Sequence, residues 1–299
     1  MTENSREIRR QHREAIGPER RSITKMWRRF RRNKLALVGL VIVGIVAFLA
    51  VFAPVVAPHD PTTPYEDKVM LSPGSEGFIL GTDPIGRDLL SRIIYGSRVS
   101  LQVGVIAVGI GVVIGVSLGL IAGYYGGIWD TLIMRLVDIF RGFPVILLAI
   151  AIMAVLGPSL YNVMIALGAV GWTTYARLVR GDSLSIREKE FVEAGRAIGL
   201  RDHQLLIHYF LPNLLAPIIV VATFGMATAI LAEASLSFLG LGIQPPTPSW
   251  GSILADGRSF IRRAPHISIF PGLAIMFTIL GFNFLGDGLR DALDPKQDR

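Results

Sequence analysis

The sequence contains no cysteine, which excludes a disulfide framework, a thiolate nucleophile and any metal site built from cysteine ligands. Lysine is scarce as well, and none of the five lysines follows a glycine. A phosphate-binding P-loop needs a Gly-Lys pair followed by serine or threonine, so the chain has no Walker-type nucleotide site. The five histidines are scattered without an HExxH spacing. These absences disfavour an ATPase or a metalloenzyme, and we expect no cofactor or metal in this chain.

Charged residues are also few, at 18% of the chain, whereas hydrophobic residues make up 51% and the mean hydropathy is +0.51. A water-soluble core cannot absorb that much apolar surface. Because backbone groups in lipid must bond within their own segment, the apolar runs should be helices. Each run is close to the ~17–25 residues that cross a bilayer, if the third begins near Thr131. The sequence therefore predicts an all-α integral membrane protein with six transmembrane helices, over residues 35–57, 101–123, 143–157, 160–176, 214–232 and 267–285.

Basic residues are concentrated before the first run, where residues 1–34 carry 12 Lys or Arg against 4 Asp or Glu. By the positive-inside rule this tail is cytoplasmic, and we expect no nucleic-acid partner for it. The run 35–57 is longer than the ~7–15 residue core of a signal peptide, so it should remain as an anchor in the lipid bilayer. After four crossings the basic segment 177–201 returns to the same side, and six crossings also place the tail 291–299 in the cytoplasm.

Two segments should lie outside the membrane. The first, 58–98, is rich in proline, which argues against a long regular element in its first part. It ends in a string in which Asp83-Pro84 can begin a short helix along the membrane surface. The second, 236–265, contains a proline-rich turn followed by Trp250, a residue suited to the membrane interface.

A stripe of glycines recurs every four residues in the second run and predicts a face on which another helix packs closely. The stripe consists of Gly111, Gly115, Gly119 and Gly123.

The third run is preceded by charges at near-helical spacing, and Phe143-Pro144 then introduces a break or kink. Arg135 and Arg141 can each reach Asp138. Because charges are costly in hydrocarbon, we expect them to be paired with each other at the membrane boundary rather than to contact a substrate.

Two polar residues inside apolar runs are candidates for the transport pathway or for a contact between helices. Glu233 stands near the end of the fifth run, and Asn283 stands in the sixth. An ionisable group in such a run is a functional candidate by default. Glu233 could contact a substrate path, a neighbouring helix or interfacial water, and the sequence does not choose among these.

A charged, helix-competent segment, 190–213, lies between the fourth and fifth runs. It should begin with a short helix that carries Phe191, Ala194 and Ile198 on one face, and Gly199 is placed to end that helix. Such a segment can present an apolar ridge to a partner protein. From spacing alone, an amphipathic cytoplasmic loop without this role is an equal alternative.

The order of residues in this segment resembles the EAA loop of ABC importer permeases. The matching residues are Glu193, Ala194, Gly195, Gly199, Leu211 and Pro212. Gly195 takes the place of the usual second alanine in that pattern.

Two further strings, GTDPIGRDLLSRIIYGSRVSL at 81–101 and LGDGLRDALDP at 285–295, resemble the C-type permease subunits of dipeptide, oligopeptide and nickel ABC importers. The resemblance spans about residues 35–296. It implies the type I (MetI-like) permease fold and a bacterial or archaeal plasma membrane. The implied divisions are a basic tail, a first anchor, an external segment, a five-helix core with a coupling loop, and a second tail, at 1–34, 35–57, 58–98, 99–290 (loop 181–212) and 291–299.

The resemblance also implies partners: a second homologous permease, two ATPase subunits that bind ATP and Mg²⁺, and an external substrate-binding protein. Glu193 would position the coupling helix on the ATPase, Gly195 and Gly199 would allow close approach and termination, and Pro212 would set the angle into the fifth helix. Peptides are the first choice of cargo, with nickel complexes and other small solutes left open. The alternative function is a secondary transporter driven by an ion gradient, which would need ionisable groups at mid-depth and often inverted repeats.

Overall fold

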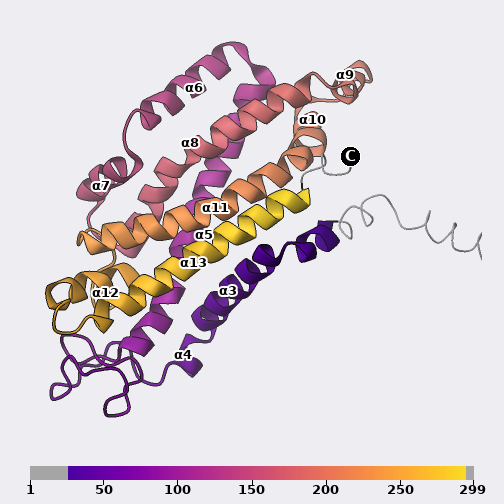
Figure 1. Cartoon of the computed structure of the whole chain (residues 1–299). Coiled ribbons are helices and arrows are strands. Elements are labelled where there is room, and N and C mark those ends of the chain that lie inside the picture. Colours follow the sequence, from indigo (N-terminus) through magenta and orange to yellow (C-terminus); the bar gives the residue numbers. More distant parts are fainter. Residues whose placement is uncertain (1–25, 294–299) are drawn as a thin grey trace, which may run out of the picture.

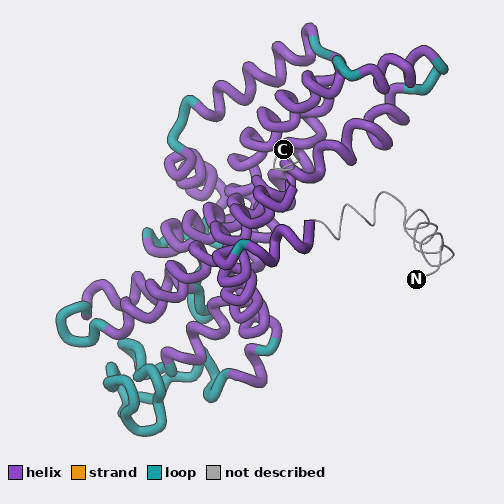
Figure 2. Tube along the Cα trace, turned by 45° about the vertical axis from the view of Figure 1, so that its right-hand side comes forward, coloured by secondary structure: helices purple, strands orange, loops and turns teal. Residues whose placement is uncertain are grey.

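The computed structural model describes residues 26–293, and this part of the chain is built from helices joined by loops, with no strand (Figures 1 and 2). The long helices are α3 (Lys34–Val51), α5 (Leu89–Tyr125), α8 (Leu160–Arg187), α11 (Leu211–Phe238) and α13 (His266–Leu293). Shorter helices connect them: α4 (Ala53–Val56), α6 (Gly127–Arg141), α7 (Val145–Leu156), α9 (Glu190–Ala197), α10 (Asp202–Leu205) and α12 (Trp250–Gly257). The prediction of an all-α protein is confirmed.

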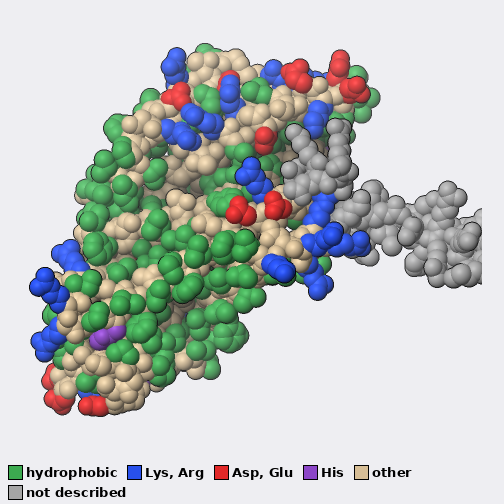
Figure 3. Space-filling model, viewed as in Figure 1, with side chains coloured by type: hydrophobic (Ala, Val, Ile, Leu, Met, Phe, Trp, Pro, Cys, Tyr) green, Lys and Arg blue, Asp and Glu red, His purple; other side chains and the backbone are tan. Residues whose placement is uncertain are grey.

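Four of the predicted transmembrane runs fall inside single helices, whereas the run 35–57 is divided between α3 and α4 and the run 143–157 begins in the bend before α7. By length and composition four helical runs of the described residues can cross a membrane, or five if the bent pair α6 and α7 counts as one span. The four are α3, α5, the run Asp202–Phe238 that contains α11, and α13. The remaining predicted run, 160–176, lies in α8, where residues such as Asn162 and Arg177 lower the hydropathy. On the face drawn in Figure 3, hydrophobic side chains cover the middle, and charged ones gather mainly at the ends and beside the start of α3.

The glycine stripe of α5 packs against α8, as its spacing predicts. A β-carbon at Gly115 would lie 2.6 Å from that of Tyr175, and one at Gly123 would lie 2.5 Å from that of Ser183. Since no larger residue fits, the glycines allow the two helix backbones to approach closely.

The second helix begins earlier than the sequence indicated. The prediction of a separate surface helix after Asp83-Pro84 is wrong, because those residues form a turn and α5 runs without interruption for 37 residues. Asp88 caps its start by accepting a hydrogen bond from the Ser91 backbone N–H. No proline lies between Leu89 and Tyr125, so the helix continues into the apolar run.

The predicted break at Phe143-Pro144 is confirmed, because the axes of α6 and α7 differ by 89° there. Proline cannot donate the backbone hydrogen bond that would continue α6. The bend turns the third apolar run back across α8.

Trp250 is buried inside the protein rather than exposed on its surface, contrary to the expectation from its type. Its side chain is 2% exposed and its indole N–H donates to the Ile93 carbonyl oxygen at 2.9 Å. Gly96 makes room for it, because a β-carbon there would lie 2.8 Å from the indole ring. Trp250 therefore anchors α12 to α5, in a region expected to be only a turn.

The start of α3 packs against the end of α13. Phe30, Ala36 and Ala292 form a small buried cluster, and the Asn33 amide donates to the Asp291 carboxylate at 3.0 Å. The two ends of the described chain thus lie side by side.

Candidate functional site

Helix α9 projects from one end of the bundle, between α8 and α10 (Figure 1). It ends where the sequence predicts. Gly199 adopts a φ of +81°, its N–H bonds the Arg196 carbonyl, and the Leu200 N–H bonds the Gly195 carbonyl, each at 3.0 Å. This pair of bonds is a Schellman motif, which satisfies the last carbonyls of the helix. The cap gives α9 a defined end on the side away from the bundle.

The inner face of α9 is held by small apolar contacts. Val192 is fully buried, and a β-carbon at Gly195 would lie 2.8 Å from a methyl of Leu205. Glycine at the position usually held by alanine therefore lets α9 sit closer to α10. Phe191 is exposed, as are Ala194 and Ile198, and its ring also stacks on the Tyr209 ring at 6.0 Å.

The outer face of α9 is available to a partner. Glu193 and Ala194 are exposed, and Ile198 is 77% exposed. Glu193 also lines a polar hollow at this end, together with Tyr124, Tyr125, Arg187, Glu188, Lys189 and Arg196. An exposed aliphatic residue beside charges of both signs can contact another protein.

Polar and aromatic contacts tie α9 and α10 to the end of α5. The Tyr124 hydroxyl donates to the Asp202 carboxylate at 2.7 Å, and the Arg196 guanidinium lies over the Tyr124 ring at 5.4 Å. The same ring packs edge-on against Phe210 at 5.3 Å. These contacts connect α9 and α10 to the end of α5 and to Phe210, just before α11.

The expectation that the fifth helix begins after Pro212 is wrong, since a single helical run extends over Asp202–Phe238. Within it, residues 206–210 form a π-turn in which the Leu211 N–H bonds the Leu206 carbonyl. The π-turn accommodates Pro212, which lacks a backbone N–H, and the Asn213 amide donates to the Tyr209 carbonyl. Leu211 is half-buried and Pro212 is exposed.

The charges of α6 pair with α8 rather than with one another. Arg180 donates twice to Asp130, at 2.6 and 2.7 Å, and Arg177 donates to Asp138 at 2.7 Å. The prediction that Asp138 pairs with Arg135 and Arg141 is therefore wrong. Arg177 and Arg180 of α8 lie beside the carboxylates of α6, so the ion pairs form between the two helices and not within α6.

Glu233 and Asn283 lie inside the bundle. Glu233 is fully buried, accepts a hydrogen bond from the Ser237 hydroxyl at 2.7 Å, and has the hydroxyls of Ser100 and Ser249 nearby. Of its open alternatives, the structure thus supports contact with neighbouring helices and not interfacial water. Asn283 is half-buried in α13 and lines neither the polar hollow at α9 nor the groove described next.

A groove that sequence reasoning missed lies between α5, α8, α11 and the bend after α6. It has a volume of about 460 Å³, and its lining includes Arg141, Thr174, Tyr175 and Thr228. The sequence signal was a Thr-Thr-Tyr string near the end of the fourth apolar run.

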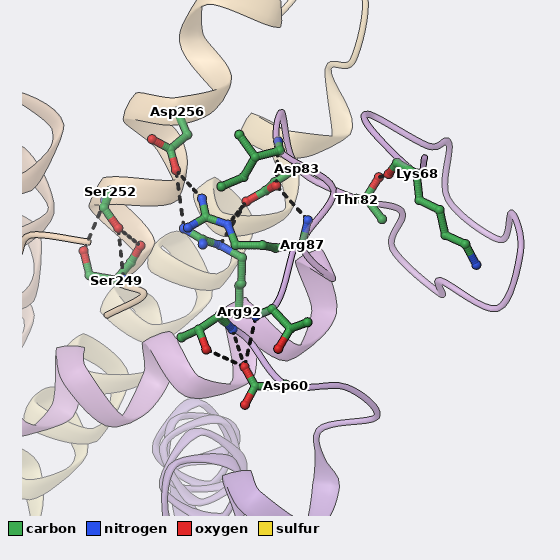
Figure 4. A network of polar contacts seen from close by, with 12 residues as sticks. Asp60, Lys68, Thr82, Asp83, Arg87, Arg92, Ser249, Ser252 and Asp256 are labelled. Atoms are coloured by element: carbon green, nitrogen blue, oxygen red, sulfur yellow. Dashed lines mark hydrogen bonds and ion pairs between the residues drawn. The ribbon is translucent and has the colours of Figure 1, made fainter. Parts of the chain in front are cut away.

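At the opposite end, the GTDPIGRD string builds a buried charge network (Figure 4). Arg87 donates to Asp83 at 2.6 Å, and both Arg87 and Arg92 contact Asp256 of α12, at 3.3 and 3.4 Å. Burial raises the pKa of the Asp256 carboxyl, and the two arginines oppose that shift. The network fastens the segment before α5 to α12.

Comparisons with known proteins agree with this architecture. Residues 115–299 match the family described as binding-protein-dependent transport system inner membrane component, and residues 23–73 match the N-terminal TM domain of oligopeptide transport permease C. The dipeptide transport system permease protein DppC of Alkalihalophilus pseudofirmus is 49% identical over 94% of this chain and 91% of its own length. The glutathione transport system permease protein GsiD of Escherichia coli is 47% identical over 91% of this chain and 90% of its own length.

Solved structures give the same fold. A structure titled as an inward facing conformation of the MetNI methionine ABC transporter aligns with a TM-score of 0.56 at 22% identity, covering 69% of this chain and 98% of that chain. An amino acid ABC transporter structure aligns with a TM-score of 0.52 at 18% identity, covering 67% of this chain and 94% of that chain. At this identity the likeness concerns the fold alone, and it matches the type I permease fold predicted from the sequence.

Proposed function

The chain belongs to the family of binding-protein-dependent transport system inner membrane components and is a permease subunit of an ATP-driven importer, and we propose that ATPase subunits drive it through α9. The observation that carries this proposal is the construction of α9. A short helix with a fixed end, a buried inner face and an exposed outer face suits a docking element. The alternative of an ion-coupled transporter finds no support among these relatives.

The proposed mechanism uses α9 as a rigid lever. ATP binding would draw the two ATPase subunits together and displace α9, with Glu193 and Ala194 at the contact and Gly195 and Gly199 fixing the helix in place. The displacement would pass through the π-turn and the Leu211-Pro212 pair into α11. Two packings of the bundle, open to opposite sides, would then exchange in response to the partner.

The proposed assembly contains a second homologous permease, two ATPase subunits that bind ATP and Mg²⁺, and an external substrate-binding protein. The basic tail, α9 and the end of α13 would face the cytoplasm of a bacterial or archaeal cell. The α12 end, with residues 58–98 and 236–265, would accept the loaded binding protein. The proposed divisions of the chain remain those at 1–34, 35–57, 58–98, 99–290 with its loop 181–212, and 291–299.

Short peptides are the proposed cargo. The two relatives above are named for the transport of dipeptides and of glutathione. Both kinds of cargo are short peptides. The test is a binding measurement on the cognate external binding protein, with panels of peptides and nickel chelates. Selective binding of a nickel chelate would contradict peptide import.

The coupling proposal is tested by Glu193→Ala in the assembled importer, with Glu188→Ala as the matched control. Both carboxylates are exposed in the same loop, but Glu188 precedes α9 and makes only a 3.7 Å ion pair with Arg187. We expect Glu193→Ala to reduce peptide-stimulated ATP hydrolysis and uptake about tenfold, equivalent to about 1.4 kcal/mol of contact energy. Assembly should be unchanged, as judged by co-purification of the ATPase. Equal coupling in the two variants would contradict the lever.

A further inference from the structure

The groove between α5, α8, α11 and the α6–α7 bend is set at the middle turns of the long helices. Its lining on α8 runs from Leu167 to Tyr175, and its lining on α11 runs from Val221 to Ala232. Both stretches are far from the ends of 28-residue helices. These stretches place the groove at the depth of the apolar runs, and the α6–α7 bend borders it on one side.

The composition of the groove differs from that of a lipid-facing surface. Many exposed positions elsewhere on these helices are large and apolar, such as Val113, Ile165 and Ile219. The groove instead presents Thr174 and Thr228, both exposed. The Thr228 hydroxyl donates to the Phe224 carbonyl oxygen at 3.1 Å, so its own helix satisfies it. A charged side chain such as Arg141 at this depth faces the interior of an assembly or a water-filled cavity, because hydrocarbon cannot solvate it.

Arg141 gives the groove a positive charge. Among residues 26–293, it is the one charged residue of the lining, and no hydrogen bond or ion pair engages it. Asp138, the carboxylate closest to Arg141 in the sequence, accepts a hydrogen bond from Arg177 at 2.7 Å. The guanidinium is exposed and so is available to an anion that enters the groove.

A phenol also borders this space. Tyr175 is buried in α8, and its hydroxyl comes so close to Gly225 of α11 that no β-carbon fits there. The small residue leaves room for the hydroxyl at the wall of the groove. Hydroxyls of threonine and tyrosine can both donate to and accept from a peptide backbone.

We propose that this groove forms part of the wall of the peptide translocation pathway and that Arg141 binds the free carboxylate of the peptide. The inference rests on the proposed function for the nature of the cargo. Its volume of about 460 Å³ lies within the ~300–1,000 Å³ of small-molecule sites. The groove holds one cation and hydroxyl groups, which match a carboxylate and amide groups.

Accessibility tests the path directly, because this chain has no cysteine and an introduced thiol is therefore unique within it. Thr174→Cys and Thr228→Cys are placed in the groove, and Val113→Cys, on a 67% exposed position of α5, is the control. In the assembled importer in vesicles, an anionic methanethiosulfonate should modify the groove thiols at least tenfold faster than the control, and peptide should slow the reaction. Unreactive groove thiols, or thiols that crosslink to the second permease, would overturn the proposal and assign the groove to a subunit interface.

The role of Arg141 is tested by a pair of reagents of opposite charge on Thr174→Cys. Arg141→Gln should lower the ratio of anionic to cationic modification rates several-fold, whereas Arg135→Gln, an exposed arginine of the same helix, should leave the ratio unchanged. An unchanged ratio in Arg141→Gln would overturn the carboxylate assignment. Since labelling needs no ATP, a failure here is distinguishable from a failure of coupling through α9, which is read from ATP hydrolysis.

Discussion

The two ends of the bundle handle their charged residues in opposite ways. At the α12 end, the side chains of Asp83, Arg92 and Arg87 are 0%, 3% and 9% exposed, and they are bound to one another (Figure 4). At the α9 end, Glu193 and Arg196 are exposed, and apolar contacts and a cap hold the helix. Buried charge networks fix a geometry, because a partner lost inside is costly. Exposed charges leave a surface free for a partner, so the comparison assigns stiffness to one end and docking to the other.

The strongest way to break this contrast is Asp83→Ala. It removes the acceptor of Arg87, and of the backbone N–H groups of Ile85 and Arg87, from a buried site. Arg87 and Arg92 keep Asp256, but removing one partner of a buried ion pair costs about 3–5 kcal/mol. We expect loss of folded protein in detergent, measured by thermal unfolding and size-exclusion yield. Asp67→Ala, at an exposed position of the same segment, is the control and should behave as wild type.

The α9 end should respond to Gly199→Ala through coupling rather than through folding. A side chain at a φ of +81° costs about 1–2 kcal/mol, which would loosen the cap of α9. The expected result is weaker peptide-stimulated ATP hydrolysis at near-normal assembly. Gly181→Ala is the control, because that helical glycine has open space around its β position and should be tolerated. Equal coupling in the two variants would mean that the cap does not hold the lever.

Local patterns were enough to predict the helix class, the bend at Phe143-Pro144 and the end of α9 at Gly199. Each depends on residues within a few positions, such as a proline or a glycine at the required backbone angle. The partner of Asp138 was not predictable in this way, because Arg177 lies 39 residues away and only helix packing brings it close. The burial of Trp250 was not predictable for the same reason, because its hydrogen-bond partner Ile93 is 157 residues away in the sequence.

The candidate site also contains one part that a local sequence pattern indicates and one part that only helix packing creates. Glu193 and its neighbours could be proposed from the sequence because a coupling loop has a compact sequence pattern. The groove around Arg141 was missed because its lining comes from four segments, and each one alone reads as an apolar helix with ordinary hydroxyl groups.

A smaller effect at the docking end is expected for Tyr124→Phe. The variant removes the 2.7 Å hydrogen bond to Asp202 but keeps the aromatic contacts with Phe210 and Arg196. A hydrogen bond of this kind contributes about 0.5–1.5 kcal/mol, and more when the acceptor is charged. Coupling efficiency, as peptide transported per ATP hydrolysed, should fall about two- to fivefold. Tyr125→Phe is the control, since that neighbouring phenol is 50% exposed. A fall of equal size in both would point to the phenols themselves rather than to the link with Asp202.

The smallest effect should come from Asp256→Asn, which weakens the stiff end only at its half-exposed edge. Because burial raises the pKa of Asp256, its carboxyl binds a proton more tightly in the folded protein than in the unfolded chain. The contribution of this proton binding to the stability of the fold is therefore largest at low pH and is lost as the pH rises through the folded pKa. We expect the stability of wild type relative to Asp256→Asn to increase as the pH is lowered toward the ordinary range of a carboxyl, in thermal unfolding at matched ionic strength. The opposite slope would mean that the attraction of Arg87 and Arg92 exceeds the effect of burial, and that the network extends to the surface of α12 with its full strength.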